Sequence, residues 1–131
     1  MINSSVIALL VILVLLVGVI ILIAHKGKPR LNKAYFNSHW EKIEQNSNYS
    51  AAIINADALI DQALKMAHVK GATLGERLNN GAGLFKNVNA VWWAHKLRNR
   101  IVHEPDMQAS AMECQKALRL YKQALKDLGA L

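Results

Sequence analysis

The residues best suited to chemistry crowd into one segment, Trp92–Glu104, which reads WWAHKLRNRIVHE. An imidazole titrates near neutral pH and can act as a general acid or base, and a guanidinium offers planar donors to a phosphate. The segment holds two histidines, three basic residues and one amide, so it is the part of the sequence with the groups for such chemistry.

The same segment offers a second reading, as a binding site without chemistry. Lys96, Arg98 and Arg100 are the clustered cations of residues 31–131, a region that carries 13 Lys and Arg against 9 Asp and Glu. Such a cluster suits an anionic ligand or RNA. These three side chains are the candidate ligand-binding or RNA-binding residues.

Helical geometry leaves a third, structural role open. Residues 98 and 103 lie about 140° apart on an ideal helix, whereas Asn99 and His103 share a face. His103 would then cap the helix C-terminus and bond Asn99. In this role Arg98 and its neighbour Arg100 pair with acids such as Glu104.

Other familiar kinds of site are missing from the sequence. It has a single cysteine, Cys114, and no H-x-x-x-H pair, so no metal site is predicted. It also lacks a nucleophile elbow, a Walker loop and a dinucleotide fingerprint, and we expect no cofactor. Cys114 falls within an apolar stripe and is interpreted as a core residue.

Apolar residues at helical spacing predict the elements that position these groups. The expected helices cover residues 31–45, 51–69, 73–79, 89–103 and 110–129. Ser50 is expected to cap the second, while Thr73 with Glu76 and Ser110 with Glu113 form capping boxes. No segment after Arg30 alternates with the period of a strand. The fold class is therefore all-α, an antiparallel bundle of four to five helices.

In the second of these helices the sequence separates an apolar face from a polar one. Ile53 and Ile60 mark the apolar face. Asp57, Asp61 and Lys65 are assigned to the opposite, solvent-facing side, with Asp61 and Lys65 ordered for an i, i+4 pair.

Residues 6–24 predict a transmembrane helix. The stretch has 19 residues, 16 of them Val, Ile or Leu, and none polar. It is long enough to cross a bilayer, and no Lys or Arg precedes it as in a cleaved signal peptide. We therefore expect an uncleaved, single-pass anchor.

Charge beside the span predicts its orientation. Lys26, Lys28, Arg30 and Lys33 all follow it, which places the C-terminal side in the cytoplasm. Residues 1–5 are then a short extracytoplasmic end, 25–30 a basic juxtamembrane linker and 31–131 a cytoplasmic domain at the cell membrane. The four cations are expected to lie at the membrane surface, against lipid headgroups.

Arg98-Asn99 followed by His103 resembles the R-x(4)-H motif of the HEPN superfamily. The resemblance extends over roughly residues 49–131. It includes a long helix, a short TLGERL helix, the motif helix and a last helix after an HEPD turn. It implies a HEPN-like helical bundle that commonly dimerises about the motif helix.

The resemblance also implies two functions. In catalytic members the domain is a metal-independent ribonuclease, in which His103 would activate the ribose 2′-hydroxyl. Arg98 would stabilise the pentavalent phosphate and Asn99 would orient the pair. Many members are instead interaction or nucleotide-binding modules. We expect a membrane-anchored interaction or ligand-binding module whose protein partner the sequence does not identify, with a membrane-tethered ribonuclease as the alternative.

Overall fold

The computed structural model describes residues 1–24 and 30–131. These residues form six α-helices and one short 3₁₀ helix. In chain order they are α1 (Ser4–Ala24), α2 (Lys33–Glu44), α3 (Tyr49–Met66), α4 (Leu74–Asn80), η1 (Ala82–Leu84), α5 (Val88–His103) and α6 (Ala111–Asp127). The protein is all-α, as predicted.

Helix α1 is the apolar N-terminal segment. It has 21 residues, none of them buried. Within the described ranges it is the one helix whose length and composition would allow it to cross a membrane. A membrane anchor and a signal sequence both have this form. Of the expected linker and membrane-surface cations, Arg30 and Lys33 are exposed. Lys26 and Lys28 lie outside the described residues.

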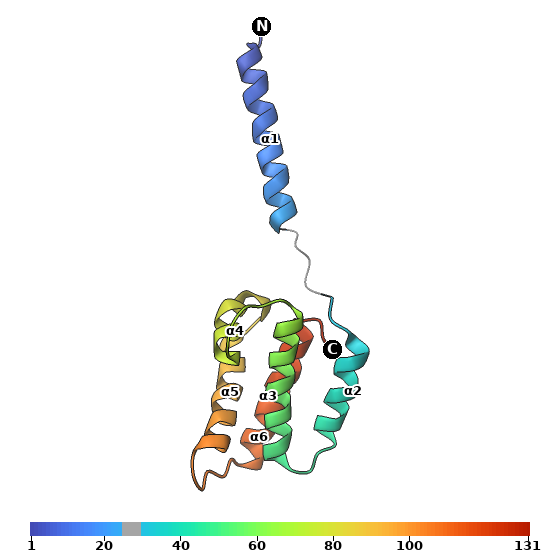
Figure 1. Ribbon diagram of the computed structural model, residues 1–131, viewed down its shortest axis with the longest axis vertical. Coiled ribbons are helices and arrows are strands. Elements are labelled where there is room, and N and C mark those ends of the chain that lie inside the picture. The colour runs from blue at the N-terminus through green and yellow to red at the C-terminus, as the bar shows by residue number, and fades with distance from the viewer. Residues whose placement is uncertain (25–29) are drawn as a thin grey trace.

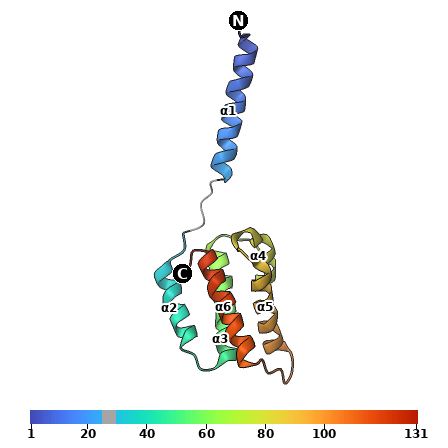
Figure 2. The same cartoon turned by 180° about the vertical axis from the view of Figure 1, so that it is seen from behind.

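Helices α2 to α6 make a packed helical body. Helices α3 and α6 are in contact at its centre, with α2 packed on α3 and with α5 packed on both (Figures 1 and 2). Consecutive long helices run antiparallel, while α3 and α6 run in the same direction (Figure 1).

The core of this body comes from the apolar faces that the sequence predicts. It includes Phe36, Trp40 and Ile43 of α2 and Cys114, Tyr121 and Leu125 of α6, whereas Ala111 is exposed and Leu118 only partly buried. The largest fully buried side chains are Tyr121, Phe36, Ile53, Ile60, Leu64, Leu78, Leu125, Leu128 and Cys114.

Helix ends follow local chemistry, and α3 differs from the expectation at both of its ends. Ser110 and Glu113 form the predicted capping box, and α5 ends at His103 as predicted. Helix α3, however, begins at Tyr49 because the Asn48 side chain accepts from the amide of Ala51 at 3.1 Å. Asn is as good an N-cap as Ser, so the earlier residue replaces Ser50.

The second difference lies at the other end of α3, which ends at Met66 rather than near residue 69. His68 adopts a left-handed conformation with φ of 60°. The amides of His68 and Val69 then bond the carbonyls of Lys65 and Leu64, which closes a Schellman motif.

The predicted capping box at α4 forms one of its two hydrogen bonds. The Thr73 hydroxyl accepts from the amide of Glu76 at 3.2 Å, as expected. The Glu76 carboxylate, however, accepts from the amide of Ala72 at 2.6 Å. Both contacts still satisfy free amides at the start of the helix.

Candidate functional site

A buried carboxylate organises the polar side of the body. Asp57 of α3 is 4% exposed, so its assignment to the solvent face is wrong. Its position explains the burial, because residue 57 lies one helical turn from both Ile53 and Ile60. Its Oδ1 accepts from the Tyr121 hydroxyl at 2.7 Å and from Nδ1 of His95 at 2.8 Å.

A chain of hydrogen bonds runs from this carboxylate along α5. Nδ2 of Asn99 lies 3.2 Å from Nε2 of His95, one turn away. Nη1 of Arg98 donates to Oδ1 of Asn99 at 3.0 Å. Each of these side-chain contacts pairs a donor with an acceptor when His95 carries its proton on Nδ1. The network thus fixes the orientation of Asn99 and, through it, of Arg98.

Arg98 also balances the charge of Asp57. Nε of Arg98 lies 3.4 Å from Oδ2 of Asp57, an ion-pair distance, but this buried N–H makes no hydrogen bond. The attraction is therefore mainly Coulombic. Burial, and then the nearby Asp57 charge, raises the pKa of the Tyr121 phenol, so Tyr121 remains a neutral donor.

Arg98 lies at the wall of an open pocket between α3, α5 and the start of α4. The pocket has a volume of about 460 Å³. It is lined by Asp57, Ala58, Asp61, Thr73, Leu74, Gly75, His95, Arg98 and Asn99. Asp61 is paired with Lys65 at 2.8 Å, as predicted, and with Arg77 at 3.0 Å. Both carboxylates in the wall are thus already matched by cations.

The guanidinium keeps binding capacity toward this pocket. Its side chain is 28% exposed, and within the described residues its hydrogen bonding is confined to Asn99. The remaining Nη donors are free for a phosphate or carboxylate, which arginine binds in a bidentate manner.

Of the three predicted binding cations, Arg98 lines a different pocket from Lys96. Lys96 and Arg100 are four residues apart on α5 and share one face of that helix. Lys96 lines a separate hollow of about 640 Å³ together with Trp92 and Trp93. Arg100 is exposed and pairs with Glu104 at 3.4 Å, the acid expected for a structural role. Arg98 alone faces the pocket above α3.

The candidate catalytic residues are brought together only in part. Arg98 and Asn99 are hydrogen-bonded to each other. The side chain of His103, the last residue of α5, is exposed and makes no hydrogen bond or ion pair with the rest of the described chain. The side-chain bond between Asn99 and His103 that the structural role predicts does not form within the described residues, because the Asn99 side chain bonds His95 instead.

The adjacent tryptophans are both half-buried, so neither points fully into the core. The ring of Trp92 meets His95 edge-on at 5.7 Å, and its outer edge would lie 3.1 Å from a Cβ added at Gly75. Trp93 is covered by Nζ of Lys116 at 4.2 Å from the ring centroid. Both rings thus pack along the edges of the body.

The described residues offer neither a group of metal ligands nor a reactive thiol. Across residues 1–24 and 30–131 no three His, Cys, Asp or Glu side chains group as metal ligands. Cys114 is buried, and burial raises the pKa of its thiol above the ordinary value. A thiol held in its protonated form is a poor nucleophile.

Sequence reasoning missed three members of the network: Asp57, His95 and Tyr121. The available signal was a carboxylate within the apolar stripe of α3, since an acid buried there must find partners. The identity of those partners is not a local property, because they lie 38 and 64 residues away in the chain.

Comparison with protein-family models, with curated proteins and with solved structures gave no match for this chain. The resemblance to HEPN domains thus rests on the motif and on the order of the helices.

Proposed function

We propose that this protein is a membrane-anchored, HEPN-like helical module that binds a phosphate-bearing ligand, such as a nucleotide, at Arg98 in the cytoplasm. The observation that carries the proposal is the partly exposed Arg98 side chain, held by Asn99 and Asp57 at the wall of an open pocket. A donor that is already oriented loses little conformational freedom on binding.

The membrane part of the proposal rests on α1 and on the charge that follows it. The helix is long and apolar enough to span a bilayer. Arg30 precedes α2 and Lys33 is its first residue; both are exposed and suited to anionic lipid headgroups. The positive-inside rule favours a cytoplasmic body.

A binding experiment tests the proposal directly. Full-length protein in phosphatidylcholine nanodiscs is dialysed to equilibrium against radiolabelled AMP, with empty nanodiscs as the blank. We expect saturable binding that Arg98→Gln weakens by about 10- to 100-fold, the loss typical of a charged hydrogen-bonded contact.

Arg119→Gln is the matched control for that substitution. Arg119 is an exposed arginine of α6 outside the pocket, so its loss should leave AMP binding unchanged. Equal weakening of AMP binding by both substitutions would show that the effect comes from the change in net charge alone. No saturable binding of AMP by the wild type would reject the proposal.

A metal-independent ribonuclease is the second candidate, and one observation favours it. His103 is exposed and free of partners in the described structure, as a general acid or base must be to reach a substrate. Because the side chain stands apart from Arg98 within one chain, this function needs a homodimer through α5. The half-exposed Trp92 and Trp93 support such an interface.

Cleavage of single-stranded RNA by the full-length protein in excess chelator tests this candidate. His103→Ala should lower the rate by at least about 100-fold, as for loss of a general acid or base. Lys96→Ala should instead weaken RNA binding and flatten its salt dependence while the rate at saturation stays. Cleavage that survives His103→Ala would exclude the mechanism.

A further inference from the structure

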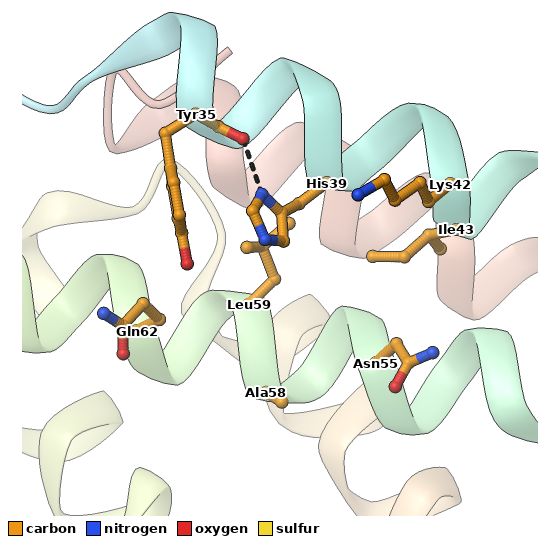
Figure 3. Close-up of a pocket in the computed structure, with 8 residues that line it drawn as sticks. All are labelled: Tyr35, His39, Lys42, Ile43, Asn55, Ala58, Leu59 and Gln62. Atoms are coloured by element: carbon orange, nitrogen blue, oxygen red, sulfur yellow. Dashed lines mark hydrogen bonds between the residues drawn. The ribbon is translucent and has the colours of Figure 1, made fainter.

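A second pocket lies between α2 and α3. Its volume is about 440 Å³, within the range of small-molecule sites. It is lined by Tyr35, His39, Lys42, Ile43, Asn55, Ala58, Leu59 and Gln62 (Figure 3). Among the described residues, only Ala58 also lines the Arg98 pocket, so the two sites are separate.

The interior of this pocket suits a flat apolar body. Ile43 and Leu59 are 4% and 5% exposed and form its floor. The rings of Tyr35 and His39 lie 4.1 Å apart between centroids, tilted by 35°, and form an aromatic wall. Figure 3 shows both rings extending from α2 toward α3. Such a surface accepts an aromatic ring by stacking and apolar contact.

Polar groups at the rim have hydrogen-bonding capacity that the described residues do not use. Nδ1 of His39 lies 2.8 Å from the carbonyl oxygen of Tyr35, which fixes the imidazole and leaves Nε2 unbonded (Figure 3). The side chains of Asn55 and Gln62, on α3, form no hydrogen bond within the described part of the chain. Their amide N–H groups and the Tyr35 hydroxyl are donors available to a ligand.

The charge of the pocket lining indicates the sign of the charge that the ligand would carry. Lys42 is the one charged side chain in its lining, and it pairs with no acid of the described residues. The Arg98 pocket, by contrast, contains two carboxylates. An unmatched ammonium above an apolar floor favours an anionic group at the rim.

We propose that the α2–α3 pocket binds a small aromatic carboxylate, with its ring between Tyr35, His39 and Leu59 and its carboxylate at Lys42. The amides of Asn55 and Gln62 provide further donors at the rim. The proposal is independent of ligand binding at Arg98.

The probe is 2-naphthoate, compared with the neutral 2-naphthamide of nearly the same shape. Full-length protein in nanodiscs is dialysed against each compound, with empty nanodiscs subtracting the partition into lipid. We expect saturable 2-naphthoate binding with a dissociation constant on the order of 0.1 mM, typical of so small a ligand. 2-Naphthamide should bind about three- to tenfold more weakly.

Substitutions at exposed lysines of α2 locate the site. Lys42→Gln should weaken 2-naphthoate binding about three- to tenfold and bring it level with the amide, while Lys42→Arg restores it. Lys33→Gln removes the same charge from the same helix outside the pocket and should have no effect. Arg98→Gln should also leave 2-naphthoate binding intact, which separates this site from the AMP site.

Three results would overturn the proposal. They are the absence of saturable 2-naphthoate binding, equal binding of acid and amide by the wild type, and equal loss of binding in Lys42→Gln and Lys33→Gln.

Discussion

Asp57 shows how one side chain can hold both the core and the site. Its carboxylate accepts from Tyr121 on α6 and from His95 on α5, and Arg98 lies beside it. A buried carboxylate without such partners would be strongly destabilising. The same bonds that satisfy Asp57 thereby join three helices and orient the residues that face the pocket.

Tyr121 gives this network a measurable pH dependence. Burial and the Asp57 charge raise its pKa in the native state, whereas an unfolded tyrosine ionises near pH 10. Its stabilising contribution is therefore complete below about pH 10 and is lost as the pH rises further, by up to about 1.4 kcal/mol per pH unit. Denaturant unfolding in dodecylmaltoside, followed by tryptophan fluorescence at pH 7 to 11, measures this loss.

The Tyr121→Phe variant separates this contribution from other alkaline effects. It should unfold about 1 kcal/mol more easily at pH 7, through loss of one hydrogen bond, but with a shallower decline above pH 10. Tyr35→Phe, at an exposed tyrosine, should keep the wild-type slope. An unchanged slope in Tyr121→Phe would contradict the assignment.

The elements themselves were largely predictable because their ends depend on nearby residues. Ser110 with Glu113 starts α6, and α5 ends at His103, as the sequence indicated. The predicted start of α3 was wrong because Asn48 and Ser50 can both cap a helix and lie two residues apart. The predicted end near residue 69 was wrong because His68 already adopts the left-handed conformation that terminates the helix.

That C-terminal cap provides the prediction at this scale. His68 has φ of 60°, a region that disfavours side chains with a Cβ by roughly 1–2 kcal/mol. His68 is exposed and its side chain makes no bond within the described residues. His68→Gly should therefore raise the free energy of unfolding by about 0.5–1 kcal/mol, measured by denaturant titration in detergent.

The neighbouring residue supplies the control. Ala67 has φ of −78°, close to helical, so Ala67→Gly only adds freedom to the unfolded chain and should destabilise by about 0.5–1 kcal/mol. A destabilising His68→Gly would show that the imidazole contributes more than its backbone strain costs.

At the scale of the whole molecule, the chain divides into an apolar helix and a polar-surfaced body. No residue of α1 is buried, and the core draws on α2 to α6. This division was predictable, because hydropathy over 19 residues needs no tertiary information. The pairing of distant helices was not, and with it the placement of Arg98 and Lys96 in different pockets.

The predicted orientation, with residues 1–5 outside and the body in the cytoplasm, is best tested with a pair of engineered thiols. The native Cys114 should give little background labelling, because it is buried and the pKa of its thiol is raised. Asn3 and Gln108 are exposed, one before α1 and one in the loop before α6. In intact cells a membrane-impermeant maleimide should label Asn3→Cys, and should label Gln108→Cys only after permeabilisation.

Each departure from that pattern has a distinct meaning. Labelling of Gln108→Cys from outside would reverse the topology and remove both nucleotide and RNA as cytoplasmic ligands. A shortened chain that has lost the Asn3→Cys label would identify α1 as a cleaved signal sequence. The expected pattern follows because cations at positions 26, 28, 30 and 33 all lie on one side of α1. Reversing the orientation would require moving these four charges across the membrane.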